Sequence, residues 1–97
     1  MVAFVVSSGP WQVYVILCGD RSFYTGISTD VPRRLNQHRR GIGARYTRGR
    51  GPLELWWVSE PFTHREALVV ERRMKQWSHA DKEALNRDGR TVSPSVG

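Results

Sequence analysis

The sequence has a single cysteine, Cys18, and no long hydrophobic run. One cysteine excludes an intrachain disulfide, and with three histidines spread widely along the chain it offers no zinc-binding spacing. The longest strictly apolar runs, residues 2–6 and 13–18, are too short for a membrane span or for the apolar region of a signal peptide. We therefore expect a cytoplasmic protein that does not contact a membrane.

The chain also lacks the length for two domains, because two halves of a 97-residue chain would each be too small to close a core without disulfides or metals. Its hydrophobic residues, 39% of the total, are enough to supply one core. We expect a single domain over residues 11–88, with loose tails at 1–10 and 89–97.

Acidic residues are missing from one long stretch of the chain. Residues 31–53 contain no Asp or Glu, but they hold seven of the fifteen basic residues. These seven are Arg33, Arg34, Arg39, Arg40, Arg45, Arg48 and Arg50. The planar guanidinium group pairs with phosphate through two hydrogen bonds, so the segment predicts a phosphate-bearing polymer as partner. The alternative is a solvated face that reflects the base composition of the source genome.

Hydrophobic patterning predicts a small α/β fold. Continuous β-branched and aromatic residues favour strands at Gln12–Cys18, Ser22–Ile27 and Leu53–Val58. Between the second and third strands, a helix is expected at Val31–Arg40, because capping oxygens precede it and Gly41 follows it. Residues 41–52 hold four glycines, which predicts a mobile loop.

Two further helices are predicted after the last strand. The capping-box pattern at Thr63 and Glu66 begins an amphipathic helix that runs to Trp77. Ser78 resembles the start of a second, short helix that ends near Asp88.

Helical geometry separates residues that composition treats alike. In the helix expected at 31–40, Arg34 and His38 are four residues apart and flank the buried stripe, whereas Arg33 and Arg40 face solvent. In the long helix Glu71 falls inside the apolar arc, where a carboxylate needs a partner. That partner is either Lys75, four residues later on the same helix, or a functional group.

These residues resemble the motifs of the GIY-YIG nuclease family, and the chain looks closest to its small single-domain bacterial members. The resemblance runs from about residue 12 to residue 77. It rests on Tyr14 in a first strand, Tyr24-Thr25-Gly26 ending a second, then Arg34, His38 and Glu71 in order. Residues 43–52 also resemble a loop in the nuclease subunit of eukaryotic structure-selective endonucleases. The chain departs from the family in lacking the first motif's glycine, in having Thr25 for isoleucine, and in having Ile27 where several relatives have lysine.

The resemblance implies a small, three-stranded, mainly antiparallel sheet flanked by helices. It also implies a divalent-metal-dependent endonuclease that leaves a 3′-hydroxyl and a 5′-phosphate. The resemblance further implies that Glu71 is the sole protein ligand to Mg²⁺ or Mn²⁺ and that Arg34 holds the scissile phosphate. Tyr24, or Tyr14 beside it, deprotonates the attacking water, and His38 orients Tyr24 or relays its proton.

Nucleic acid, DNA more than RNA, is the expected partner. The nucleic-acid-binding residues expected are Arg33, Arg39, Arg40, Arg45, Tyr46, Arg48 and Arg50. Trp56, Trp57 or Tyr46 is a candidate for stacking on an unpaired base. Two alternatives stay open: a non-catalytic DNA- or RNA-binding module on the nuclease scaffold, and a catalytic subunit that needs a protein partner to choose its substrate.

Overall fold

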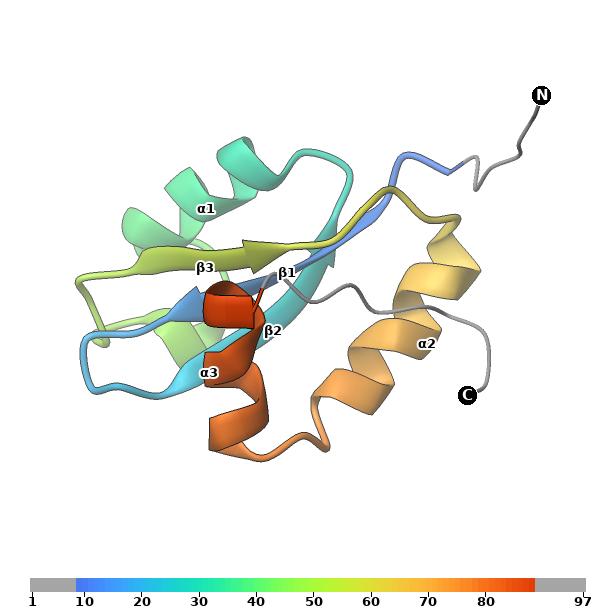
Figure 1. The fold of residues 1–97 in the computed structure, drawn as a ribbon. Helices are drawn as coiled ribbons and strands as arrows, with labels where there is room; N and C mark the ends of the chain where they lie inside the picture. Colours follow the sequence, from blue (N-terminus) through green and yellow to red (C-terminus); the bar gives the residue numbers. More distant parts are fainter. Residues whose placement is uncertain (1–8, 89–97) are drawn as a thin grey trace, which may run out of the picture.

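The computed structural model describes residues 9–88, which form a three-stranded sheet between helices (Figure 1). The central strand β1 (Gln12–Leu17) pairs with β2 (Phe23–Ser28) on one side and with β3 (Glu54–Val58) on the other. Both pairings are antiparallel. The predicted three-stranded sheet is thus confirmed, with strand ends that differ by one residue from the prediction.

Three α-helices and one turn of 3-10 helix surround the sheet. They are α1 (Val31–Arg39), η1 (Arg45–Thr47), α2 (His64–Met74) and α3 (His79–Asp88). The Asp30 side chain caps α1 by accepting from the Arg33 amide at 3.1 Å. Thr63 and Glu66 form the predicted capping box at the start of α2. No helix within residues 9–88 has both the length and the apolar character to cross a membrane.

The sheet separates two hydrophobic cores, with α1 on one face and α2 and α3 on the other (Figure 1). Because side chains alternate along a strand, Tyr14 and Ile16 of β1 pack toward α1, while Val13 and Val15 pack toward α2 and α3. Burial of β1 on both faces explains why its sequence is continuously apolar. In the register of β1 and β2, Tyr24 lies opposite Ile16, so both tyrosines of the resemblance lie on the α1 face.

Helix α2 is shorter than predicted. It ends at Met74 rather than Trp77, because the chain then tightens into a turn in which the Gln76 and Trp77 amides donate to the Arg73 and Met74 carbonyls. The predicted domain bounds, 11–88, stay a prediction. The predicted tails lie outside the described residues except for residues 9 and 10.

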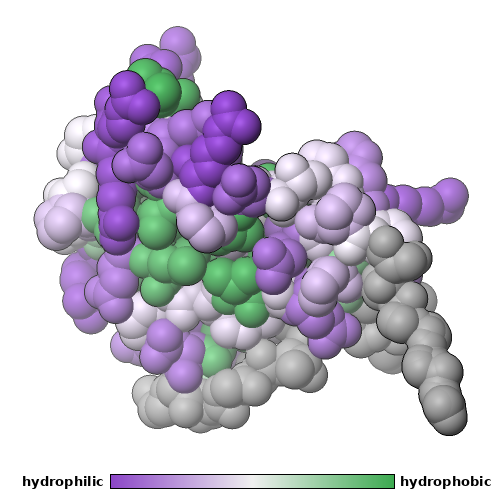
Figure 2. All heavy atoms as spheres, turned by 90° about the horizontal axis from the view of Figure 1, so that it is seen from above, coloured by the Kyte–Doolittle hydropathy of each residue, from purple (hydrophilic) through white to green (hydrophobic). Residues whose placement is uncertain are grey.

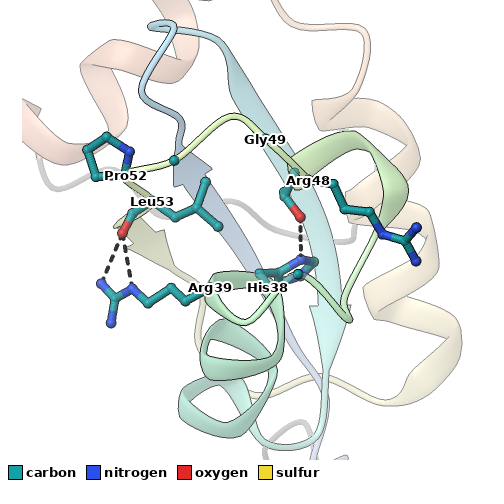
Figure 3. A pocket seen from close by; sticks show the side chains of 9 residues that line it. His38, Arg39, Arg48, Gly49, Pro52 and Leu53 are labelled. Carbon is teal, nitrogen blue, oxygen red and sulfur yellow. Dashed lines mark hydrogen bonds between the residues drawn. The ribbon is translucent and has the colours of Figure 1, made fainter.

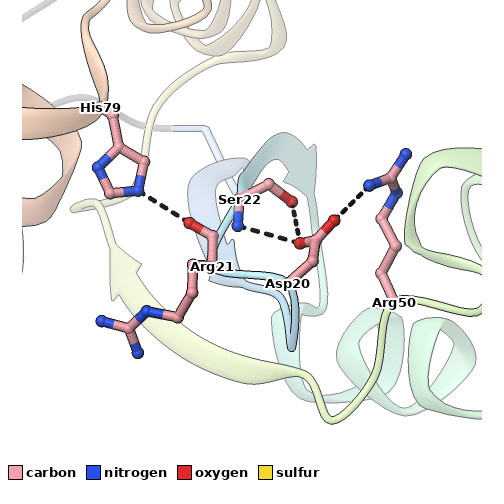
Figure 4. A network of polar contacts seen from close by, with 5 residues as sticks. All are labelled: Asp20, Arg21, Ser22, Arg50 and His79. Carbon is pink, nitrogen blue, oxygen red and sulfur yellow. Dashed lines mark hydrogen bonds and ion pairs between the residues drawn. The ribbon is translucent and has the colours of Figure 1, made fainter.

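Residues 41–52, predicted to be a mobile loop, contain η1 and are anchored at several points. The Gly19 amide donates to the Arg50 carbonyl at 2.5 Å, and the Arg50 side chain forms an ion pair with Asp20 in the β1–β2 turn (Figure 4). Arg39 donates two hydrogen bonds, of 3.0 and 3.2 Å, to the Leu53 carbonyl (Figure 3). Glycine content indicates which backbone conformations are accessible; it does not report such long-range bonds.

Candidate functional site

The two tyrosines meet on the α1 face of the sheet. Their ring centroids lie 6.3 Å apart, and Tyr14 is only 1% exposed, whereas Tyr24 is half-buried. Tyr14 lies across Gly26 of β2: a Cβ atom at that position would be 2.6 Å from the Tyr14 hydroxyl oxygen. Only glycine therefore allows Tyr14 to approach β2 this closely.

His38 lies under the tyrosines and is also only 1% exposed. Its Nε2 is 2.8 Å from the Tyr14 hydroxyl, and its Nδ1 is 2.9 Å from the Thr47 hydroxyl. We predicted that His38 orients Tyr24, but the hydrogen bond goes to Tyr14, and His38 meets Tyr24 ring edge to face at 5.2 Å. Burial, and secondarily the positive charge of Arg34, lower the pKa of His38, which keeps the imidazole neutral at neutral pH.

Arg34 and Glu71 approach the tyrosines from two different helices. Arg34, on α1, donates to the Gln37 side-chain oxygen at 2.9 Å. Glu71, on α2, has a side chain that is 18% exposed and forms an ion pair with Lys75 at 3.3 Å. Both Arg34 and Glu71 lie close enough to influence the ionisation of Tyr14. The ion pair with Lys75 is therefore formed, and the negative charge of Glu71 also acts on Tyr14.

Burial raises the pKa of Tyr14 to about 12. The nearby Tyr24 and Glu71 act in the same direction, while hydrogen bonding and positive charge from Arg34 partly oppose the shift. Tyr14 is thus held protonated well above neutral pH.

The raised pKa of Tyr14 predicts a loss of stability at alkaline pH. Below pH 10, tyrosine is protonated in both the folded and unfolded chain, and this contribution to stability is fully present. Between pH 10 and about 12, the unfolded tyrosine ionises while folded Tyr14 does not, so the free energy of unfolding falls, by up to about 3 kcal/mol. Urea unfolding at a series of pH values would show this fall in the wild type and a smaller one in Tyr14→Phe. Tyr46→Phe, at a site that is 40% exposed, is the matched control and leaves the fall unchanged.

The arginines of residues 31–53 differ in exposure. Arg33, Arg39, Arg40, Arg45 and Arg48 are exposed, whereas Arg34 and Arg50 are half-buried. Arg39 and Arg50 also hold the backbone and the β1–β2 turn, and their contacts to nucleic acid stay a prediction. Seen from the α1 side, hydrophilic side chains border a smaller exposed apolar area (Figure 2).

Tyr46 is the aromatic residue that the structure places beside both the site and the arginines. It stacks on Tyr24 with ring centroids 5.9 Å apart, and the Arg50 guanidinium lies 4.3 Å from its ring centroid. Trp56 and Trp57, the other stacking candidates, pack against the core between the sheet and helices α2 and α3. Tyr46 is therefore the stacking candidate that the structure retains.

Two hollows adjoin these groups. One, of about 250 Å³, lies at the start of α1 and is lined by Arg33, Arg34 and Gln37 together with residues 28–30. The other, of about 380 Å³, lies between α1 and the segment that carries η1, and its lining includes His38 and Arg48 (Figure 3). The first hollow places two guanidinium groups where a phosphate would be held.

The Glu71 carboxylate is suited to a Mg²⁺ site that has few protein ligands. Among residues 9–88 there is no cluster of three or more metal-ligating side chains, so the protein does not build an enclosed metal centre there. Mg²⁺ keeps several waters and is often held by one or two carboxylates together with substrate phosphates. A single half-buried carboxylate such as Glu71 matches that requirement.

Sequence reasoning missed three groups that support the site. The Thr47 hydroxyl and the Ala44 amide contact His38, and Gln37 holds Arg34. Gln37 lies three residues from Arg34, a spacing that could have revealed it. Thr47 and Ala44 lay in a segment predicted to be mobile, and no pattern there indicated their contacts.

Comparison with known proteins agrees with this geometry. A family model described as the GIY-YIG catalytic domain matches residues 10–86. A UPF0213 protein of Vibrio cholerae is 49% identical over 78 residues, which cover 78% of this chain and 76% of the relative. A UPF0213 protein of Halobacterium salinarum is 51% identical over 74 residues, covering 76% and 96%. The solution NMR structure of a protein from E. faecalis superposes with a TM-score of 0.53 at 37% identity, covering 80% of this chain and 83% of that one.

Proposed function

Because the chain belongs to the GIY-YIG catalytic-domain family, we propose that it is a divalent-metal-dependent endonuclease. Its proposed substrate is nucleic acid, DNA rather than RNA, and its products are a 3′-hydroxyl and a 5′-phosphate. The observation that carries this proposal is the convergence of Tyr14, Tyr24, Arg34 and His38 on one face of the sheet, with the charge of Glu71 also acting on Tyr14.

Glu71 would hold Mg²⁺ or Mn²⁺, and the bound ion would polarise the scissile phosphate and lower the pKa of a coordinated water. Arg34 binds the same phosphate and neutralises the negative charge that builds up on its oxygens in the transition state. Gln37 keeps the Arg34 guanidinium in place through its 2.9 Å hydrogen bond.

Tyr24 is the general base in this proposal. It is half-buried and borders exposed Tyr46, whereas Tyr14 is enclosed and has a pKa of about 12. Tyr24 takes a proton from water, and the resulting hydroxide attacks phosphorus and expels the 3′ oxygen.

The exposed arginines provide contacts to the nucleic-acid backbone that do not depend on base sequence. If Arg33, Arg40, Arg45 and Arg48 each meet one phosphate of duplex DNA, the logarithm of the binding constant falls with the logarithm of salt concentration with a slope of roughly −3 to −4. Fluorescence anisotropy with labelled DNA at several salt concentrations would measure this slope. An affinity that hardly changes from low to physiological salt would contradict the assignment.

Two adjacent arginines provide a matched comparison for the same measurement. Arg40→Ala removes an exposed charge and lowers the steepness of the slope by about one. Arg39→Ala removes the two hydrogen bonds to the Leu53 carbonyl and lowers thermal stability more than Arg40→Ala does.

A cleavage assay tests the activity itself. The pure protein is incubated with labelled single-stranded, duplex and branched DNA and RNA, with Mn²⁺, with Mg²⁺ or with chelator. Cleavage that requires the ion supports an endonuclease. The alternative is a non-catalytic binding module, which the Glu71–Lys75 ion pair favours because the carboxylate already has a cationic partner. Salt-sensitive binding without cleavage of any substrate would support this alternative.

A further inference from the structure

The 3-10 helix η1 closes over the buried histidine of the site. It brings Thr47, which is only 2% exposed, to within 2.9 Å of His38 Nδ1. The amide of Ala44, immediately before η1, lies 3.2 Å from the same nitrogen. Two groups from the segment that follows α1, six and nine residues after His38, therefore converge on one atom of its ring.

Gly43 makes this approach possible. A Cβ atom at position 43 would collide with the His38 ring, lying 2.9 Å from Cγ and closer still to Nδ1. The chain therefore passes directly against the imidazole, and the amide of the next residue, Ala44, points at Nδ1.

The Ala44 amide determines which ring nitrogen of His38 carries the hydrogen. A backbone N–H can only donate, so Nδ1 must accept with its lone pair. The neutral imidazole has one hydrogen, which must then be on Nε2. The Thr47 hydroxyl has a single hydrogen and two acceptors within reach, the Ala44 carbonyl at 3.0 Å and Nδ1 at 2.9 Å. With Nδ1 unprotonated, the hydroxyl shares this hydrogen between them, since two lone pairs facing each other at 2.9 Å would repel.

This tautomer sets the direction of the hydrogen bond to Tyr14. His38 Nε2–H donates to the Tyr14 hydroxyl oxygen at 2.8 Å, so the hydroxyl hydrogen of Tyr14 is directed to a different acceptor. In the opposite tautomer, Nε2 would instead accept the hydroxyl hydrogen of Tyr14.

We propose that Thr47 is a positioning residue of the nuclease site: together with the Ala44 amide it holds His38 as the Nε2–H tautomer, so that the Tyr14 hydroxyl hydrogen is available to an acceptor other than His38. Thr47 acts only through His38 and Tyr14. The expected effect of Thr47 on kcat rests on the proposed nuclease function, whereas the expected tautomer of His38 does not.

Nitrogen-15 NMR of the full chain tests the tautomer directly. A ring nitrogen that carries a hydrogen and one that carries a lone pair resonate in well-separated regions. At neutral pH we expect Nε2 of His38 to be protonated and Nδ1 to be unprotonated, with assignments made against His38→Gln. A protonated Nδ1 in the wild type overturns the proposal, whether or not the protein cuts nucleic acid.

Two substitutions test the role of Thr47. Thr47→Val keeps the shape and removes the hydroxyl; we expect it to shift the His38 nitrogen resonances and to lower kcat roughly tenfold to a hundredfold, with little change in nucleic-acid affinity. Thr47→Ser restores the hydroxyl and returns both measurements toward the wild type. A Thr47→Val protein with wild-type kcat and unchanged His38 resonances overturns the proposal while leaving the nuclease function intact.

Discussion

Glu71→Gln is expected to lower metal-dependent turnover by at least about a hundredfold, because an electrophilic cation contributes several kcal/mol to stabilising the transition state. The substitution keeps the shape of a half-buried side chain, so the fold is retained. Titration calorimetry with Mn²⁺ would show loss of binding. Nucleic-acid affinity in chelator stays the same or rises slightly, because a negative charge near the phosphate is removed.

Lys75→Gln is the matched control for Glu71. It breaks the same 3.3 Å ion pair from the other side and leaves the carboxylate in place. Ion pairs of this kind on a helix contribute only about 0.3 to 0.5 kcal/mol, so Lys75→Gln leaves stability and turnover close to those of the wild type. Wild-type cleavage by Glu71→Gln in Mg²⁺ would remove Glu71 as a metal ligand and, with it, most of the proposed mechanism.

Arg34→Ala is expected to lower turnover at saturating substrate by roughly two to three orders of magnitude. Loss of one preorganised donor to developing negative charge has an effect of this size in other enzymes. Single-turnover cleavage with enzyme in excess would separate this chemical defect from weaker binding.

Arg33→Ala provides the comparison, since Arg33 is the neighbouring residue on the same helix and is exposed, whereas Arg34 is half-buried. We expect it to weaken binding and to leave the single-turnover rate close to the wild-type value. Equal defects in turnover for the two variants would show that the assignment of Arg34 to the scissile phosphate is wrong.

Much of the fold could be predicted from local pattern. The continuous apolar run of β1 indicated a strand buried on both faces, and the Thr63–Glu66 capping box marked the start of α2. Helical phase placed His38 beside the buried stripe of α1 and Arg33 on its outer face, as the structure has them. These features depend on residues a few positions apart, whose relative placement a helix or a strand determines.

The contacts that could not be predicted join distant parts of the chain. Arg50 meets Asp20 across 30 residues, and nothing in either local sequence indicates the other. The hydrogen bond from His38 to Tyr14, rather than to Tyr24, depends on how α1 docks on the sheet, which periodicity does not specify. Glu71 had two possible partners in the sequence, and the structure shows the ion pair with Lys75.

The anchoring of residues 41–52 has a consequence for binding entropy. A flexible arginine-rich loop would lose backbone freedom each time it ordered against a phosphate chain, and this loss would weaken the complex. Here the ion pair of Arg50 with Asp20 and the hydrogen bonds of Arg39 to Leu53 restrain the segment in the free protein. Part of that ordering therefore occurs during folding, and the proposed nucleic-acid surface is restrained before it binds.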